Sequence, residues 1–201
     1  MCGACTGQAP HTPAPAAGAS VGDGGLIYFW SDRDWPALWS MWADGSHQRR
    51  IYDTHQNAKR PTPSPDGCKL VLDAPTPGSD SDLFVVDAHR GRVLRRLTTT
   101  PALEQAVAWS PDGRKILFTR YSLDSPWLAD VFVVNADGTG KRRLTHAAGD
   151  DVAAAWSPDG RRVVFTSARS GFDQIFVMNA DGSDQRQLSR GNYRNEATSW
   201  Q

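Results

Sequence analysis

The sequence lacks an excess of charge of either sign. Its 201 residues contain 22 Lys and Arg against 22 Asp and Glu, so the formal net charge is zero. A surface that binds nucleic acid or an anionic membrane needs a clustered basic excess. We therefore expect no nucleic-acid partner, and expect instead a neutral partner or a local binding site.

Long apolar runs are also missing. No stretch of the sequence is long enough to cross a bilayer or to form the core of a signal peptide. No long helical pattern occurs either, whereas 18 glycines and 13 prolines separate short runs rich in Val, Ile, Phe and Trp. We expect many short strands joined by tight turns and no transmembrane segment, which leaves a cytoplasmic location open.

Catalytic signatures are scarce. The five histidines have no Ser or Cys partner that the sequence places beside them, and neither a Gly-x-Ser-x-Gly elbow nor a His-x-x-His pair occurs. The three cysteines, Cys2, Cys5 and Cys68, specify no disulfide framework. We predict that the protein is not an enzyme and needs no cofactor, with calcium as an open alternative.

The sequence does contain an internal repeat. The segment Trp109–Thr119 reads almost as Trp156–Thr166, and a weaker copy begins at Ser64. Equivalent glycines of successive copies, Gly67, Gly113 and Gly160, are 46 and 47 residues apart. This period lies within the range of a β-propeller blade, roughly 40 to 50 residues.

A second landmark follows the first at a steady offset. Val131–Gly138 recurs as Ile175–Gly182, and older versions begin at Leu83 and Leu38. The Ser-Pro-Asp-Gly and Asn-Ala-Asp-Gly sequences favour tight turns, because proline presets φ and glycine accepts a positive φ. The apolar segments between the turns fit strands that are buried on both faces. Each copy therefore predicts four strands, A to D, with strand A ending in Trp-Ser.

The first unit lacks a strand A, and the end of the chain supplies one. Leu26–Trp30 matches a B strand, whereas Asn195–Trp200 matches the A strand Asp151–Trp156. Because an unclosed stack of blades would expose two apolar faces, we predict an all-β propeller of four four-stranded antiparallel blades, the first closed by the C-terminal strand. Two alternatives stay open: half of an eight-bladed homodimer formed by end-strand exchange, or a fragment of a larger propeller.

Composition divides the chain into two parts. Residues 1–24 form a Pro/Ala/Gly-rich tail, and residues 25–201 form the propeller domain, with units at about 26–63, 64–109, 110–156 and 157–201. Gly3-Ala4-Cys5 and the linker after it resemble the end of a bacterial lipoprotein signal and its tether. Either Cys5 carries a lipid outside the cytoplasm, or the tail is disordered.

The repeat itself resembles a known family. Trp156–Arg161, the apolar strand after it and Ile175–Ser183 are similar to the TolB-type propeller repeat, and the resemblance extends from about Leu26 to Trp200. It implies a periplasmic or cell-envelope scaffold that binds a protein or peptide through loops at the mouth of the channel. The same repeat occurs in prolyl oligopeptidase-type enzymes. The alternative function is therefore a propeller domain or accessory of a hydrolase or lyase that binds metal or glycan at an acidic channel mouth.

Polar residues just before each strand A are the first candidate site. In the family pattern these loops approach the central channel, where carboxylates and amides can bind a cation, a peptide amino group or a basic side chain. The candidates are Glu104, Asp150, Asp151, Asn195 and Glu196. The alternative is that polar residues simply begin strands at a wet surface.

Two loop tryptophans, Trp35 and Trp127, are the second candidate site. An exposed indole ring buries a large area on binding with little loss of entropy, and packing in the core is the alternative. A third set, Asp82, Asp130 and Asp173, opens strand C in three units. We expect these carboxylates to accept hydrogen bonds from backbone N–H groups of the preceding turn.

Overall fold

The computed structural model describes residues 26–31, 37–53, 59–125, 128–197 and 199–200. All regular elements among them are β-strands, which form four antiparallel sheets. Sheet 1 contains β1 (Leu26–Ser31), β2 (Ala37–Trp42) and β3 (Arg49–Asp53), and sheet 2 contains β4 (Lys59–Pro63), β5 (Lys69–Thr76), β6 (Ser79–Asp87) and β7 (Val93–Arg96). Sheet 3 contains β8 (Glu104–Trp109), β9 (Lys115–Tyr121), β10 (Ala129–Asn135) and β11 (Arg142–Arg143). Sheet 4 contains β12 (Asp151–Trp156), β13 (Arg162–Ser167), β14 (Gln174–Asn179) and β15 (Arg186–Gln187).

The predicted all-β class and its strand order are confirmed. Sheets 2, 3 and 4 each contain four strands in the order A to D, and strands A of sheets 3 and 4 end at Trp109 and Trp156 as expected. β1 is the B strand of sheet 1. The repeat therefore predicts the order of the strands within the described sheets.

The Ser-Pro-Asp-Gly turns are closed by their own side chains. In sheet 3 the carboxylate of Asp112 accepts hydrogen bonds from the Ser110 hydroxyl at 2.6 Å and the Arg114 N–H at 3.0 Å, while Gly113 takes a φ of 68°. These bonds lower the pKa of Asp112 below its usual value. The same bonds recur around Asp66 and Asp159. Cys68, which follows one of these turns, is disulfide-bonded, a pairing that the sequence did not specify.

The cores lie between successive sheets, because strand B alternates its side chains between two neighbours. Leu70 and Leu72 of β5 pack with Leu38 of sheet 1, whereas Val71 packs with Ile116 of sheet 3. A third core joins sheets 3 and 4 in the same way. Each sheet is thus held by apolar contact with its neighbours along the chain.

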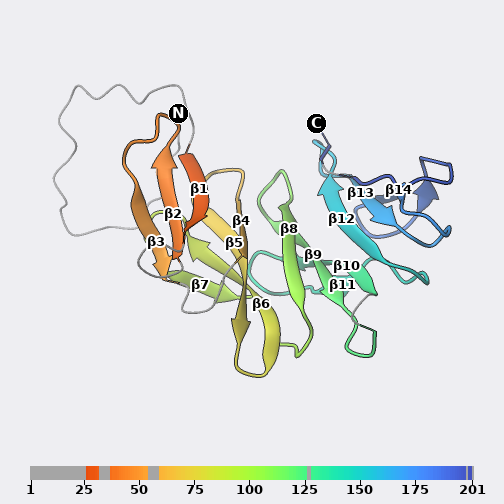
Figure 1. The fold of residues 1–201 in the computed structure, drawn as a ribbon, viewed down its shortest axis with the longest axis horizontal. Coiled ribbons are helices and arrows are strands. Elements are labelled where there is room, and N and C mark those ends of the chain that lie inside the picture. The colour runs from red at the N-terminus through yellow and green to blue at the C-terminus, as the bar shows by residue number, and fades with distance from the viewer. Residues whose placement is uncertain (1–25, 32–36, 54–58, 126–127, 198, 201) are drawn as a thin grey trace.

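The four sheets form an arc, with sheet 1 at one end and sheet 4 at the other (Figure 1). The inner strands β4, β8 and β12 contact one another in order along its concave side. The outer strands β7, β11 and β15 lie at the opposite edges of their sheets. The inner strands are consequently the elements that line a central cleft.

The predicted closure of the first blade is corrected by the structure. Sheet 1 has three strands, and the described residues Asn195–Ala197, Ser199 and Trp200 belong to no strand. The segment lies on sheet 4 instead, where the Ala197 N–H donates to the Thr166 hydroxyl at 2.9 Å. Because sheets 1 and 4 are at opposite ends of the arc, β1 is out of its reach within one chain.

Sheets 1 and 2 come into close contact at Gly91. Its φ is 66°, and a Cβ added there would lie 1.5 Å from the carbonyl oxygen of Ile51 in β3. The two backbones therefore touch at a position where only glycine fits.

We expect Gly91→Ala to destabilise the protein far more than Gly45→Ala. Gly45 also has a positive φ, 81°, but a Cβ there meets no atom within 4 Å, so the control costs only the local strain of about 1 kcal/mol. Gly91→Ala adds a clash with backbone and should cost about 3 kcal/mol or more. Urea unfolding of both variants measures the difference, and equal losses would contradict the close contact.

Candidate functional site

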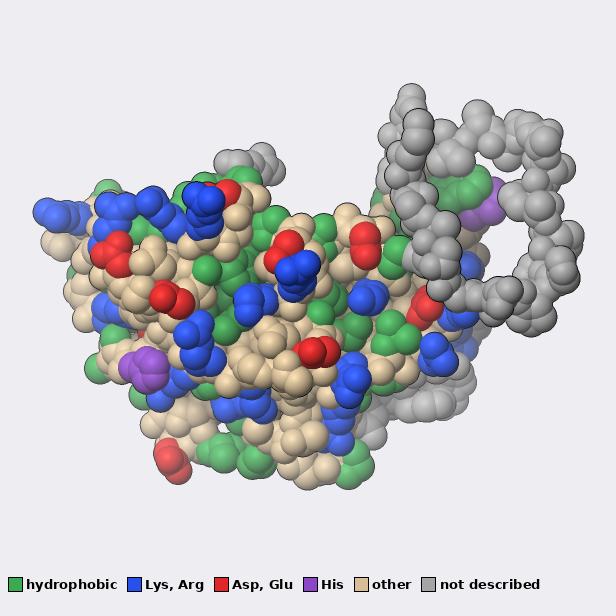
Figure 2. Space-filling view, turned by 180° about the vertical axis from the view of Figure 1, so that it is seen from behind, with side chains coloured by type: hydrophobic (Ala, Val, Ile, Leu, Met, Phe, Trp, Pro, Cys, Tyr) green, Lys and Arg blue, Asp and Glu red, His purple; other side chains and the backbone are tan. Residues whose placement is uncertain are grey.

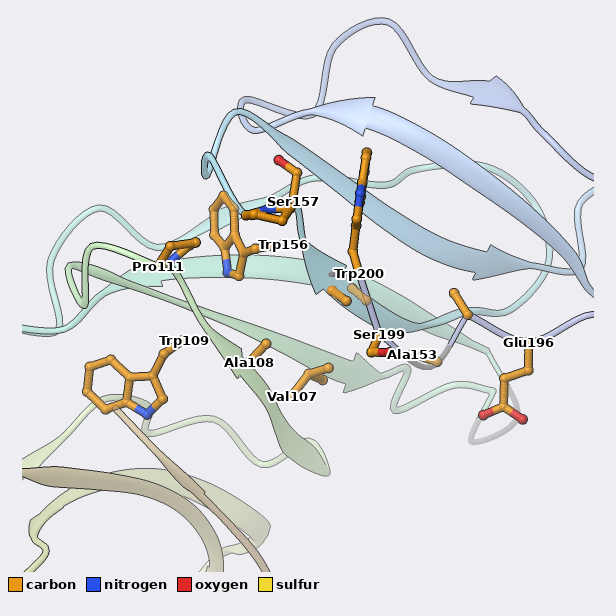
Figure 3. A pocket seen from close by; sticks show the side chains of 14 residues that line it. Val107, Ala108, Trp109, Pro111, Ala153, Trp156, Ser157, Glu196, Ser199 and Trp200 are labelled. Carbon is orange, nitrogen blue, oxygen red and sulfur yellow. The ribbon is translucent and has the colours of Figure 1, made fainter. Parts of the chain in front are cut away.

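A groove runs along the concave side of the arc between β8 and β12. We call it the inner groove; its volume is about 810 Å³, and the C-terminal segment forms part of its wall. Its lining includes Val107, Ala108, Trp109, Ala153, Trp156 and Trp200. Figure 3 shows Trp109 near one end and Glu196 near the other, with Val107 and Ala108 between them. Small apolar side chains therefore form its floor, and indole rings stand beside it.

The inner groove continues into a second cavity at the start of the inner strands. This mouth pocket has a volume of about 460 Å³, and Val107, Ala153 and Glu196 line both cavities. Thr62, Gln105, Tyr121 and Asp150 complete its polar wall. The two cavities together offer an apolar track that ends in carboxylates and hydroxyls, the combination typical of peptide and small-molecule sites.

The backbone is strained where the two cavities meet. Ala153 has a φ of 51°, and the register between β12 and β13 shifts between Val152 and Ala155. A left-handed alanine costs roughly 1 kcal/mol, and such strain and bulges cluster at binding sites. The bulge places Ala153 in the lining of both cavities.

Two of the predicted site carboxylates line the mouth pocket. Glu196 is exposed, and Asp150 is half-buried with its Oδ1 accepting the Ala129 N–H at 2.9 Å. Burial raises the pKa of Asp150 above its usual value, and the neighbouring carboxylates of Asp151, Asp173 and Asp130 raise it further. A positive ligand group beside Asp150 would relieve this cost.

We expect Asp150→Asn to stabilise the free protein at pH 7. The folded chain holds the Asp150 proton more tightly than the unfolded chain, so its stabilising effect is complete below about pH 3.8 and is lost as the pH rises through the folded pKa. Asparagine keeps the acceptor for Ala129 and removes the charge. Urea unfolding should show a gain of at most about 1 kcal/mol at pH 7 that vanishes at pH 3. A gain that persists at pH 3 would contradict the assignment.

Two other predicted residues, Glu104 and Asp151, do not line the cavities. Both are completely buried. Arg120 forms an ion pair with Glu104 at 2.6 Å and lies over Phe132, with its guanidinium carbon 4.4 Å from the ring centroid. Arg169 forms an ion pair with Asp151 at 3.0 Å and lies over Phe176 at 4.8 Å. These carboxylates are therefore already neutralised within the sheets.

We expect the Glu104 pair to carry a large share of stability. Arg120→Gln leaves a buried carboxylate without a cation and should lower the free energy of unfolding by about 3 kcal/mol. Arg143→Gln in the same sheet is the matched control, because Arg143 and its partner Asp130 are 42% and 20% exposed. Its cost should stay below about 1 kcal/mol. Similar costs in chemical denaturation would show that the Glu104 pair is solvated.

The strand-C carboxylates also differ from the prediction. Asp82 and Asp130 pair with Arg96 and Arg143 across to strand D, instead of accepting hydrogen bonds from a preceding turn. The equivalent residue of sheet 4 is Gln174 and not Asp173, since Gln174 accepts the Ser189 hydroxyl at 2.8 Å as Asp130 accepts that of Thr145. Asp173 forms a looser pair with Arg194 at 3.5 Å. Asp82, Asp130 and Gln174 therefore tie strand C to the end of strand D, whereas Asp173 does not.

The remaining candidates fall into two groups. Asn195 is half-buried, and its side chain donates to Gln174 at 3.2 Å, so it anchors the C-terminal segment to sheet 4. Trp35 and Trp127 lie outside the described residues. Val107, Ala153 and Trp200 also line the inner groove, and the sequence predicted none of the three as a site residue. The small residues of Ala153-Ala154-Ala155 were the available signal, because small side chains on an inner strand leave space.

The described residues show mixed surface charge and no cluster of metal-binding side chains. Lys and Arg side chains are interspersed with Asp and Glu on the face shown in Figure 2. Among the described residues, no group of three or more His, Cys, Asp or Glu side chains is arranged to hold a metal ion. None of the described segments forms a helix that is long and apolar enough to span a membrane.

The chain is similar to known proteins in part of its sequence and in its fold. Residues 120–201 match the family described as TolB beta propeller domain. Among solved structures, TolB from Acinetobacter baumannii is similar with a TM-score of 0.72 at 20% identity, over 88% of this chain and 44% of that one. A puromycin hydrolase is similar with a TM-score of 0.65 at 20% identity, over 85% of this chain and 30% of that one. An oligogalacturonate lyase in complex with manganese is similar with a TM-score of 0.61 at 17% identity, over 83% of this chain and 50% of that one. The chain spans half or less of the length of each.

Proposed function

We propose that this chain, which carries the TolB-like propeller repeat and fold, is a non-catalytic scaffold that binds a protein or peptide segment at the bacterial cell envelope. The inner groove and the mouth pocket are the proposed site. The observation that carries the proposal is their continuity: an apolar track along β8 and β12 leads to Asp150 and Glu196. The location rests on the family resemblance.

The chemistry of the site favours a segment with apolar side chains and one positive group. Val107, Ala108 and Ala153 offer an apolar floor, and Trp200 adds a half-buried ring that can cover a bound side chain. Glu196 forms no ion pair with a described residue, and the carboxylate of Asp150 has a raised pKa. A peptide amino group or a basic side chain would satisfy both carboxylates.

The alternative, a hydrolase or lyase accessory that binds metal at an acidic mouth, receives less support. It needs free carboxylates ahead of strand A, and two of the expected four are buried in ion pairs with Arg120 and Arg169. Metal binding requires ligands that are not already neutralised by a fixed cation. The similar puromycin hydrolase and oligogalacturonate lyase structures show a shared fold at low identity and leave this preference unchanged.

We expect peptides selected from a phage-displayed random library to bind the wild-type chain and to lose binding to Val107→Arg. Val107 lines both cavities, so a long cationic side chain there fills the apolar track. Val93→Arg is the matched control, because Val93 lies on the outer strand β7 and is 41% exposed. Calorimetric titration should show at least about a tenfold loss for the first variant and no change for the second.

Two results would overturn the proposal. One is that peptides bind both variants equally, which would place the site elsewhere. The other is that the library yields no binder while the chain hydrolyses model peptides or glycans. The double variant Asp150→Asn, Glu196→Gln further tests the charge of the ligand. It should weaken the binding of peptides with a free amino group more than the binding of the same peptides after acetylation.

A further inference from the structure

Sheet 1 exposes an apolar side chain whose equivalents are buried. Ile27 on β1 is 39% exposed, whereas Ile116 on β9 and Val163 on β13 are fully buried. The three residues are equivalent because each pairs with the same position of strand C: Met41, Val134 and Met178. In sheets 3 and 4 this side chain packs against the preceding sheet. Among the described residues, no sheet precedes sheet 1.

Sheet 4 shows the complementary exposure. Leu188 is 54% exposed, whereas its equivalents Leu97 and Leu144 are 6% and 2% exposed. The three leucines are equivalent because each donates its backbone N–H to the carbonyl oxygen of the first apolar residue of strand C. These acceptors are Leu83 for Leu97, Val131 for Leu144 and Ile175 for Leu188. Leu97 and Leu144 are buried against the following sheet. Sheet 4 therefore presents the face that a further sheet would cover.

The C-terminal segment already occupies the place of the next inner strand. β8 contacts sheet 2 and β12 contacts sheet 3. Asn195 and Ala197 likewise contact sheet 4, through bonds from their N–H groups to the Asp173 carbonyl at 2.7 Å and the Thr166 hydroxyl at 2.9 Å. The segment also has the sequence of a strand A, ending in Ser199 and Trp200. Its outer edge is the edge that would pair with a strand B.

We propose that a second copy of this chain completes both ends. Sheet 4 and the segment Asn195–Trp200 of each copy pack on sheet 1 of the other, and the segment pairs with β1 as its missing strand A. The observed register predicts Trp200 opposite Ile27, as Trp109 lies opposite Ile116 and Trp156 opposite Val163. Two reciprocal contacts related by a two-fold axis close the assembly, as in other symmetric dimers. The result is a ring of eight sheets, within the range of known propellers.

A second copy fits better than closure within one chain. Sheets 1 and 4 are at opposite ends of the arc (Figure 1), and bringing them together would change the packing of all three cores. Close-packed cores resist such bending. Another copy carries both complementary faces in the correct register. Among the described strands β1 is the edge of sheet 1, beside the exposed Leu26 and Ile27, and pairing with a second copy covers this edge.

Molar mass in solution tests the proposal. Light scattering on the purified 201-residue chain should give twice the 22.0 kDa mass of one copy. Leu188→Asp should weaken association about 100-fold or more, because the dimer would bury an unpaired charge. The substitution should leave the fold of each copy unchanged, because Leu188 is exposed in the single chain. Leu123→Asp is the control, since Leu123 is 64% exposed in the loop after β9 and should leave the dimer intact. A wild-type chain that stays monomeric overturns the proposal.

Photocrosslinking tests the register directly. Benzoylphenylalanine replaces Leu26, next to Ile27, and the variant is mixed with an isotopically heavy wild-type chain. We expect crosslinks from position 26 to residues 195–200, joining light and heavy peptides. Crosslinks to that segment within light chains alone would show closure inside one copy and contradict the proposal. A dimer whose crosslinks lead to any other segment would contradict it as well.

Discussion

The structure depends on the face-to-face burial of sheets by their neighbours. The B strands of sheets 2 and 3 place one set of apolar side chains toward the preceding sheet and the alternate set toward the following one, as Leu70 and Val71 show. A sheet buried on both faces has no stable form by itself, since its apolar area would meet water. The position of the inner strands, and hence of the inner groove between β8 and β12, follows from this packing.

The sequence predicted this arrangement well where the information is local. Turns such as Ser110-Pro111-Asp112-Gly113 fix the hairpins, and continuous apolar runs fix the double-sided burial, so the class, the strand order and the sheet content could be read directly. Closure could not. Whether Asn195–Trp200 reaches β1 depends on the curvature accumulated over three interfaces, and no single repeat encodes that sum.

The candidate site shows the same division. The sequence suggested one role for Asp150, Glu196, Glu104 and Asp151, but only Asp150 and Glu196 line the mouth pocket. The partners of Glu104 and Asp151 explain the difference: Arg120 lies in β9, but Arg169 lies after the end of β13, so the two cations are not aligned in the repeat and no spacing rule reveals them. In the strand C and D network, sheet 3 joins Asp130 and Arg143, while sheet 4 uses Gln174 and Gln187. The geometry is kept with neutral amides, which a search for conserved charge would miss.

The side-chain bonds inside the Ser-Pro-Asp-Gly turns bear on how the molecule acquires its shape. Each clamp joins residues within five positions of one another, as between Ser64 and Lys69, so it can form before any distant segment arrives. Short-range contacts of this kind close quickly, because little chain entropy is lost. Each clamped hairpin can thus serve as a separate nucleus during biosynthesis, and the emerging polypeptide can add its sheets one after another onto a surface already formed.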